Sequence, residues 1–206
     1  MNARVAGYDW TAIASHLDAH GWAALPSLLT AAECADLAAL YDDDARFRSR
    51  VVMARHGFGR GEYKYFAYPL PDLVAGLRAA LYARLAPVAN AWNEAMGVDV
   101  RYPHAHAGVI ARCHAAGQAR PTPLLLRYDE GDFNALHQDV YGEHLLPLQA
   151  AVLLAGPGRD FTRRARAHRA APADAVARRS GAARPRRARR IPRQPAPWGE
   201  PAALGP

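Results

Sequence analysis

The spacing of apolar residues near the N-terminus predicts two short amphipathic helices. Asp9 is placed to cap a first helix, which continues as far as the residue before Gly21. Thr30 and Glu33 form a Thr-x-x-Glu capping box, which predicts a second helix that runs to about Tyr41. The first part of the chain is therefore expected to be helical.

A strand and a broken helix are expected next. The alternating aromatic run at residues 63–68 predicts a strand. Pro71 then begins helical material that continues through Leu85, is interrupted at Pro87 and resumes as far as Met96. We expect the interruption because proline has no amide hydrogen to donate within a helix.

Beyond Pro121 the helical spacing gives way to short apolar runs, which predict strands. The expected strands are residues 124–128, 136–141 and 148–154, and a turn at 129–132 joins the first two. Helices first and strands later make α+β the expected fold class.

Charge is divided unevenly along the chain, which has 206 residues and a formal net charge of +7. Residues 163–206 carry 12 Arg against Asp174 and Glu200, a net charge of +10, so the first 162 residues sum to 7 − 10 = −3. Arg, Ala and Pro dominate this tail, and such a segment cannot bury enough apolar surface to offset its ordering entropy. We therefore expect a globular part, residues 1–162, followed by a disordered Arg/Ala/Pro tail, residues 163–206.

Two interpretations of this tail are open. Clustered arginines can form an arm that neutralises nucleic-acid phosphates. Alternatively, Lys64 is the one lysine among 26 Lys and Arg, which indicates a GC-rich gene, and GC-rich DNA read out of frame is translated mainly into Ala, Arg, Pro and Gly. The tail is then either a nucleic-acid-binding arm or an out-of-frame product.

The sequence also indicates a compartment. The longest nearly apolar run, residues 145–156, is too short for a membrane-spanning helix, which needs about 20 residues. The N-terminus has no apolar leader with a small-residue cleavage site. Cys34 and Cys113 are too few for a disulfide scaffold and fit a reducing compartment. We expect a protein without a membrane partner, located in the cytoplasm.

Several groups of histidines or glycines are better explained without a ligand. His16 and His20 share a helix face, but Leu17 stands where a zinc protease needs glutamate. Residues 56–61 lack the third glycine of a phosphate loop and are expected to form a flexible loop. A last group has no paired Cys-x-x-Cys to complete a zinc site and consists of His104, His106, Cys113 and His114.

The most informative pair is His137 and Asp139, which are separated by one residue on an expected strand. Side chains two apart on a strand point to the same face, so both can bind one metal ion. One imidazole and one carboxylate are two of the three ligands in the facial triad that holds non-haem Fe(II). A pair of common residues is weak evidence by itself, and its surroundings decide its meaning.

Those surroundings resemble a known superfamily. The pattern Tyr128-x-x-Gly131-x-x-x-x-x-His137-x-Asp139 resembles the iron- and 2-oxoglutarate-dependent dioxygenases, which include prolyl 4-hydroxylases and alkylated-DNA demethylases. Three stretches extend the likeness to a bacterial family of such oxygenases, described as acting in oxidative demethylation of damaged DNA, over about residues 8–162. They are Phe-Arg-Ser-Arg-Val-Val-Met from residue 47, Arg-Gly-Glu-Tyr-Lys-Tyr-Phe from residue 60, and His-Gln-Asp-Val-Tyr-Gly-Glu-His from residue 137.

The resemblance implies a fold, a set of ligands and a reaction. The fold would be N-terminal helices, residues 1–100, packed on a partial double-stranded β-helix or jelly roll whose first strands lie in residues 101–162. His137 and Asp139 would be the catalytic iron ligands, and Tyr128 would donate a hydrogen bond to the 2-oxoglutarate carboxylate. Leu126 stands where the demethylases have an asparagine that also contacts this cosubstrate. With molecular oxygen, the reaction would be oxidative demethylation of damaged DNA, a form of DNA repair.

Part of the family pattern is missing. A second histidine ligand and a basic residue for the far 2-oxoglutarate carboxylate are expected on later strands, but His168, the one histidine of the tail, has no strand pattern around it. The chain therefore resembles a dioxygenase cut off or frameshifted after residue 162. The alternatives are a prolyl-hydroxylase-like enzyme acting on protein, or a catalytically dead domain with a basic nucleic-acid-binding tail. If DNA is bound by the globular part, Arg55, Arg60 and Lys64 are the candidate contacts.

Overall fold

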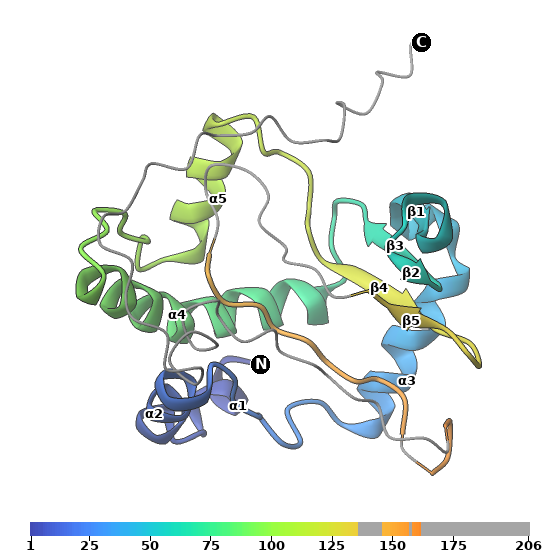
Figure 1. Cartoon of the computed structure of the whole chain (residues 1–206), viewed down its shortest axis with the longest axis horizontal. Coiled ribbons are helices and arrows are strands. Elements are labelled where there is room, and N and C mark those ends of the chain that lie inside the picture. The colour runs from blue at the N-terminus through green and yellow to red at the C-terminus, as the bar shows by residue number, and fades with distance from the viewer. Residues whose placement is uncertain (136–145, 157, 162–206) are drawn as a thin grey trace, which may run out of the picture. The chain divides into compact units, whose positions relative to one another are not determined.

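The computed structural model describes residues 1–135, 146–156 and 158–161 (Figure 1), all within the first of its two units, Met1–Arg166 and Ala167–Pro206. The second unit, with most of the Arg/Ala/Pro tail, lies outside the described residues. The helices are α1 (Asn2–Ala6), α2 (Trp10–His20), α3 (Ala31–Ala39), α4 (Asp72–Ala95) and α5 (His106–Ala115), with short 3-10 helices at η1 (Leu40–Asp42), η2 (Asp44–Arg46) and η3 (Met53–His56). The strands are β1 (Phe47–Val52), β2 (Gly59–Arg60), β3 (Glu62–Phe66), β4 (Leu124–Arg127) and β5 (Phe133–Asn134).

Capping residues set the ends of the first two predicted helices. The Asp9 carboxylate accepts hydrogen bonds from two backbone amides in the first turn of α2, and Gly21 ends that helix with a φ of 72°. Thr30 and Glu33 form the expected capping box at the start of α3. Both predictions are confirmed, because a cap depends on residues only three apart in the sequence.

Helix α4 is continuous, so the predicted interruption at Pro87 is wrong. Pro87 lies inside the helix with its ring exposed, while the neighbouring Ala86 and Ala89 are fully buried. Further along the same helix, Asn90 and Asn93 hold the returning chain by side-chain hydrogen bonds to backbone carbonyls. Packing on both sides of Pro87 therefore offsets the one hydrogen bond that proline cannot make.

Replacing Pro87 by alanine is expected to stabilise the protein. Alanine restores the missing amide donor and is about 3 kcal/mol better than proline in a helix interior, so a gain of about 1–3 kcal/mol in the free energy of unfolding is expected. Urea unfolding measures the gain, and Ala83→Gly, one turn earlier on the exposed face, is the control that should lose about 1 kcal/mol. A loss of stability in Pro87→Ala would show that the ring itself supports the helix.

The strands form two small antiparallel sheets. In the larger sheet β3 lies between β1 and β4, and in the smaller one β2 pairs with β5 (Figure 1). The rings of Phe47 on β1 and Phe66 on β3 stack with centroids 4.8 Å apart. A separate hydrophobic core packs α1 against α4. Its buried residues are Val5, Leu28, Leu77, Ala80 and Leu81. Strand β3, at the centre of its sheet, is the predicted aromatic strand.

The structure departs from the sequence-based prediction in other places. Residues 148–154, expected to be a strand, form none, and Val152 and Leu153 are exposed. A strand is stable only when a neighbour pairs with it, and none of the described strands lies beside this segment. Helices α1 and α5 and strand β1 were not predicted. The expected strand at 136–141 lies outside the described residues.

The α+β class is confirmed at the level of helices with small antiparallel sheets. The described strands close no barrel, so the jelly roll stays an expectation. None of the helices in the described residues is long and apolar enough to cross a membrane.

Candidate functional site

Tyr128 directly follows β4, and its ring lies against the backbone of Gly61. A Cβ added to Gly61 would lie 2.8 Å from Tyr128 Cδ1, and Gly61 also has a φ of 118°, which favours glycine. The Gly61 carbonyl accepts a hydrogen bond of 3.0 Å from the Met53 amide. Because Gly61 has no side chain, the Tyr128 ring can pack directly against the backbone before β3.

The Tyr128 phenol is suited to donate a hydrogen bond. Burial raises its pKa, and the negative charge of Asp132 raises it further, so the hydroxyl keeps its proton at neutral pH. Its ring is still 43% exposed, and no group in the described parts of the chain accepts a hydrogen bond from the hydroxyl. A ligand with an acceptor oxygen could therefore be bound here.

The turn after Tyr128 is the predicted one. The Asp132 amide donates to the Asp129 carbonyl at 3.1 Å, and the Asp132 carboxylate accepts from the Asp129 amide at 3.0 Å. Gly131 has a φ of 83°, which suits glycine in a tight turn. Asp132 also lies 3.7 Å from Arg60 on β2, so the turn is tied to the neighbouring strand.

Strands β2 and β5 hold the chain immediately before the expected iron ligands. Gly59 lies opposite Asn134, and the Ala135 amide donates to the Phe58 carbonyl at 2.8 Å. A Cβ at Gly59 would lie 2.2 Å from the Phe133 carbonyl oxygen, so only glycine allows the two strands to approach. Residues 56–61, predicted to be a flexible loop, are therefore partly a strand, because this pairing orders them.

His137 and Asp139 themselves lie outside the described residues, as does His168. Among the residues that are described, no group of three His, Cys, Asp or Glu side chains could hold a metal ion. His16 and His20 are in ring contact on α2 with centroids 4.3 Å apart, as expected for one helix face. The metal pair therefore stays a prediction, and the pairing of β2 with β5 orders the segment that leads into it.

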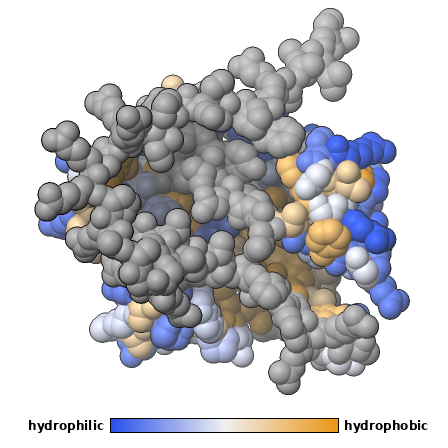
Figure 2. All heavy atoms as spheres, in the orientation of Figure 1, coloured by the Kyte–Doolittle hydropathy of each residue, from blue (hydrophilic) through white to orange (hydrophobic). Residues whose placement is uncertain are grey.

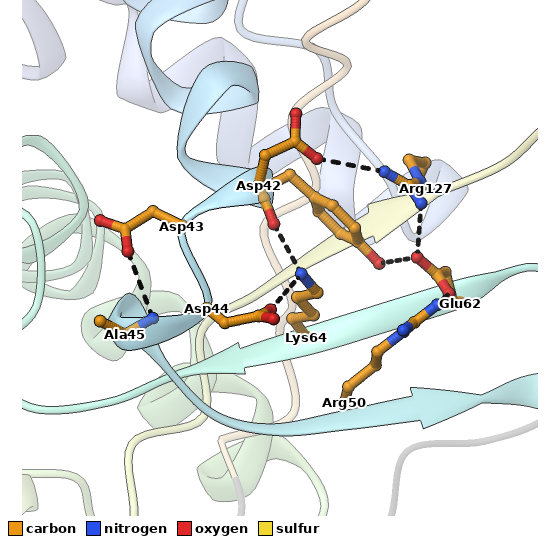
Figure 3. A network of polar contacts seen from close by, with 9 residues as sticks. Asp42, Asp43, Asp44, Ala45, Arg50, Glu62, Lys64 and Arg127 are labelled. Carbon is orange, nitrogen blue, oxygen red and sulfur yellow. Dashed lines mark hydrogen bonds and ion pairs between the residues drawn. The ribbon is translucent and has the colours of Figure 1, made fainter.

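A network of charges lies beside this site and was not predicted. Glu62 on β3 is 13% exposed and accepts hydrogen bonds from the Tyr41 hydroxyl at 2.9 Å and from the Arg50 guanidinium. Arg127 on β4, directly before Tyr128, approaches Glu62 at 2.9 Å and Asp42 at 3.4 Å. Figure 3 shows Arg127 directed toward both carboxylates. The network joins all three strands of the larger sheet to η1, which follows α3.

Lys64 belongs to the same network and is buried, with 6% of its surface exposed. Its Nζ donates to the Tyr41 carbonyl at 2.7 Å and to the Asp44 carboxylate at 2.6 Å (Figure 3). It also lies over the rings of Tyr41 and Phe47. Lys64 is thus a structural residue and is not available to DNA, contrary to its place among the candidate DNA contacts.

The signal that could have revealed this network is the strand period of two. Glu62 and Lys64 are two residues apart on β3, so both point to the face where Tyr41 lies. Tyr63 and Tyr65 alternate with them, and their rings meet edge to face with centroids 5.5 Å apart. Charged residues alternating with aromatics on a central strand indicate a buried polar network.

Around the site the surface is mixed. Figure 2 shows hydrophobic and hydrophilic groups side by side where Figure 1 has the strands. The exposed apolar side chains of this part include Leu126, Tyr128 and Phe133. Leu126 offers no polar atom to a cosubstrate, in agreement with the missing asparagine noted in the sequence.

Comparison with known proteins identifies the family. A family model with the description "Oxygenase, catalysing oxidative methylation of damaged DNA" matches residues 61–165, half of the chain. The chain belongs to this family. The match begins at Gly61 and includes β3, β4, Tyr128 and the His137-x-Asp139 segment. The resemblance to oxygenases acting on damaged DNA is thus confirmed over this segment, which is shorter than the 8–162 expected.

Relatives of this oxygenase family member include two uncharacterized proteins of Mycobacterium tuberculosis, from strains CDC 1551 and H37Rv. Each is 43% identical to the chain over 97 residues, which is 47% of this chain and 42% of the relative. The matched segment thus spans less than half the length of these relatives. No solved structure matches the chain.

Proposed function

We propose that the protein is an Fe(II)- and 2-oxoglutarate-dependent oxygenase that removes methyl groups from damaged DNA bases. The observation that supports this most directly is the order of elements inside the family segment. Strand β4 is followed by Tyr128, by the Gly131 turn and by β5, which ends three residues before His137. This order is what the superfamily pattern requires ahead of its first two metal ligands.

The donor set fits iron in kind. His137 and Asp139 offer one imidazole nitrogen and one carboxylate, which are two of the three ligands of the facial triad. The described residues contain no preformed three-ligand cluster that would compete for the metal. When bound, iron and 2-oxoglutarate would supply the oxidation by molecular oxygen, in which 2-oxoglutarate is converted to succinate and carbon dioxide and one substrate C–H bond becomes C–OH.

Removal of the methyl group follows from the chemistry of an oxygenase. Insertion of one oxygen atom into an N-methyl group gives an N-hydroxymethyl group, which loses formaldehyde and leaves the N–H of the normal base. An oxygenase uses no methyl donor, so we interpret the methylation named in the family description as demethylation. The second oxygen atom of molecular oxygen is incorporated into succinate.

The chain's own residues would bind and orient the cosubstrate. Tyr128, with its pKa raised by burial, would donate a hydrogen bond from its hydroxyl to a 2-oxoglutarate carboxylate oxygen. Gly61 fixes the ring of this tyrosine, and the pairing of β2 with β5 sets where the His137-x-Asp139 segment starts. Orientation of this kind is the protein's part in cofactor chemistry.

The proposal is tested with the full chain, Fe(II), 2-oxoglutarate and N-methylated single-stranded DNA. His137→Ala and Asp139→Ala are each expected to abolish iron-dependent succinate and formaldehyde formation, because each removes a ligand. Tyr128→Phe is expected to raise the KM for 2-oxoglutarate about tenfold, the loss of one hydrogen bond to a charged group. Turnover is measured as succinate and formaldehyde released.

His20→Ala is the matched control, because His20 is an exposed histidine on α2, far along the chain from the pair. It should leave turnover unchanged. Equal turnover in the wild type and both ligand variants would contradict the proposal, and no turnover at all with the wild type would favour the catalytically dead domain that the missing histidine leaves as an alternative. Hydroxylation of proline peptides without activity on DNA would instead favour a protein substrate.

A further inference from the structure

Helix α5 lies in a stretch of the chain that has positive charge and no carboxylates. Between residues 100 and 128 there are four Arg and three His, and neither Asp nor Glu occurs. This contrasts with the net charge of −3 for the first 162 residues as a whole. The stretch around α5 is therefore positive, as are residues 45–61, which carry five Arg and no Asp or Glu.

The arginines here are held by backbone groups instead of ion pairs. The Arg112 guanidinium donates to the Arg101 carbonyl at 2.8 Å, and Arg101 in turn donates to the Val100 carbonyl at 3.1 Å. Arg78 on α4 donates to the Tyr68 hydroxyl at 3.4 Å. None of the three forms an ion pair with a carboxylate of the described residues, and this includes Asp99, which is the carboxylate nearest to Arg101 in sequence. Their charges are left uncompensated.

Two arginines act on one contact between α4 and α5. The ring of His106, at the start of α5, lies 5.3 Å from the ring of Tyr82 on α4. Burial lowers the pKa of His106, and the positive charge of Arg78 lowers it further. Burial raises the pKa of Tyr82, while the positive charge of Arg112 acts against this rise. The charges of Arg78 and Arg112 thus both reach this contact, and two positive charges near one place favour binding of an anion.

Helix α5 has room for a partner. None of its residues is buried, and both Arg101 and Arg112 are exposed. The segment before α5 is attached to α4 by the 2.6 Å hydrogen bond from the Tyr82 hydroxyl to the Pro103 carbonyl, and the helix itself contacts α4 through the rings of His106 and Tyr82. Half of the residues of α5 are exposed, among them Arg112, and these are open to a ligand.

We propose that the surface formed by Arg78, Arg101 and Arg112, here called the α5 basic surface, binds the phosphate backbone of single-stranded DNA. Guanidinium groups without carboxylate partners match phosphate in charge and geometry. A chain that must present one base to a catalytic centre also needs sequence-independent contacts to hold its backbone. This inference relies on the proposed function only for the choice of DNA as the polyanion.

The surface expected from the sequence is less suitable. Lys64 is buried against Asp44, and Arg60 lies beside Asp132. The turn next to Arg60 adds further acidic residues, so phosphates would meet negative charge there. Of the three residues considered from the sequence, Arg55 alone is exposed and has no ion pair among the described residues.

The test measures binding of a labelled oligothymidylate to the full chain by fluorescence anisotropy between 0.05 and about 0.2 M salt, without iron or 2-oxoglutarate. Each phosphate contact on a single strand contributes about 0.7 to the slope of log K against log salt concentration. The double variant Arg101→Ala/Arg112→Ala is therefore expected to lower the slope by about 1.4 and to weaken binding about 25-fold at 0.1 M salt.

Arg55→Ala/Arg60→Ala is the matched control, because it removes the same charge from the surface expected from the sequence, and it should change the slope little. Arg101→Lys/Arg112→Lys keeps the charge and should restore most of the affinity. Circular dichroism checks that every variant is folded, and the Arg-rich tail is identical in all of them.

Equal slopes for the two alanine variants, or a larger effect of Arg55→Ala/Arg60→Ala, would overturn the proposal. The proposal would also be overturned if Arg101→Ala/Arg112→Ala lost binding to phosphatidylserine vesicles but bound the oligonucleotide as the wild type does. The surface would then serve a membrane. Because no turnover is measured, failure of this proposal and failure of the oxygenase proposal are separate results.

Discussion

Replacing Gly59 by alanine is expected to separate β2 from β5 and to destabilise the protein by at least about 2 kcal/mol. The added Cβ would lie 2.2 Å from the Phe133 carbonyl oxygen and 2.9 Å from the Ala135 amide nitrogen, both backbone atoms that cannot rotate away. A φ of 117° adds strain for any residue with a side chain. Hydrogen exchange at the Ala135 amide, which donates to Phe58, reports on this pairing.

Gly57→Ala is the control for this prediction. Gly57 also has a positive φ, 70°, but an added Cβ would meet nothing within 4 Å. The Gly57→Ala variant should therefore lose only about 1–2 kcal/mol of stability, because alanine is strained in a left-handed conformation. Hydrogen exchange at the Ala135 amide should be unchanged. Equal losses of stability and equal exchange in both variants would mean that the strand pairing does not depend on close approach at Gly59.

Replacing Glu62 by alanine is expected to lower the free energy of unfolding by about 2–3 kcal/mol, because it leaves Tyr41, Arg50 and Arg127 without their shared acceptor. The loss should be smaller than the 3–5 kcal/mol typical of fully buried pairs, since both arginines are about half exposed and water can replace part of the interaction. Urea unfolding measures the loss. Glu94→Ala, at an exposed glutamate near the end of α4, is the control and should change stability by less than about 0.5 kcal/mol.

The same residue predicts a pH dependence. Burial tends to raise the pKa of Glu62, but the hydrogen bonds from Arg50 and Tyr41 and the positive charges of the arginines outweigh it, so the pKa lies below its ordinary value of 4.5. A carboxylate with a lowered pKa contributes stability above its unfolded-state value, and this contribution is lost as the pH falls through the folded-state value. Glu62→Gln should therefore flatten the fall in stability below pH 4.5. An unchanged acid profile would show that the carboxylate is not held by these partners.

Local signals explain which parts of the fold could be predicted. The caps at Asp9 and Thr30 and the Gly131 turn depend on residues within a few positions of one another, and the structure has all three. The break expected at Pro87 was local reasoning as well, but burial of Ala86 and Ala89 by distant parts of the chain overrides it.

The elements that were missed depend on distant partners. Strand β1 shows no clear alternation and exists because β3 pairs with it, Arg50 lying opposite Lys64. Helix α5 has few large apolar residues and is fixed by contacts with α4, such as that between the rings of His106 and Tyr82. At the site, Tyr128 and its turn followed from the sequence pattern. The salt bridge between Arg127 and Glu62 could not be foreseen, because it joins strands more than sixty residues apart.

The position of β3 has a consequence for how this protein can be divided. The family match starts at Gly61, but the strand that follows is flanked by β1 and receives hydrogen bonds from Tyr41 and Arg50, all of which precede the matched residues. A fragment that began at Gly61 would expose one edge of β3. Glu62 and Lys64 would lose the partners that precede Gly61 and would face water instead. The segment that the family model matches is thus not expected to fold by itself, because β1 and Tyr41, which precede it, complete the surroundings of its first strand.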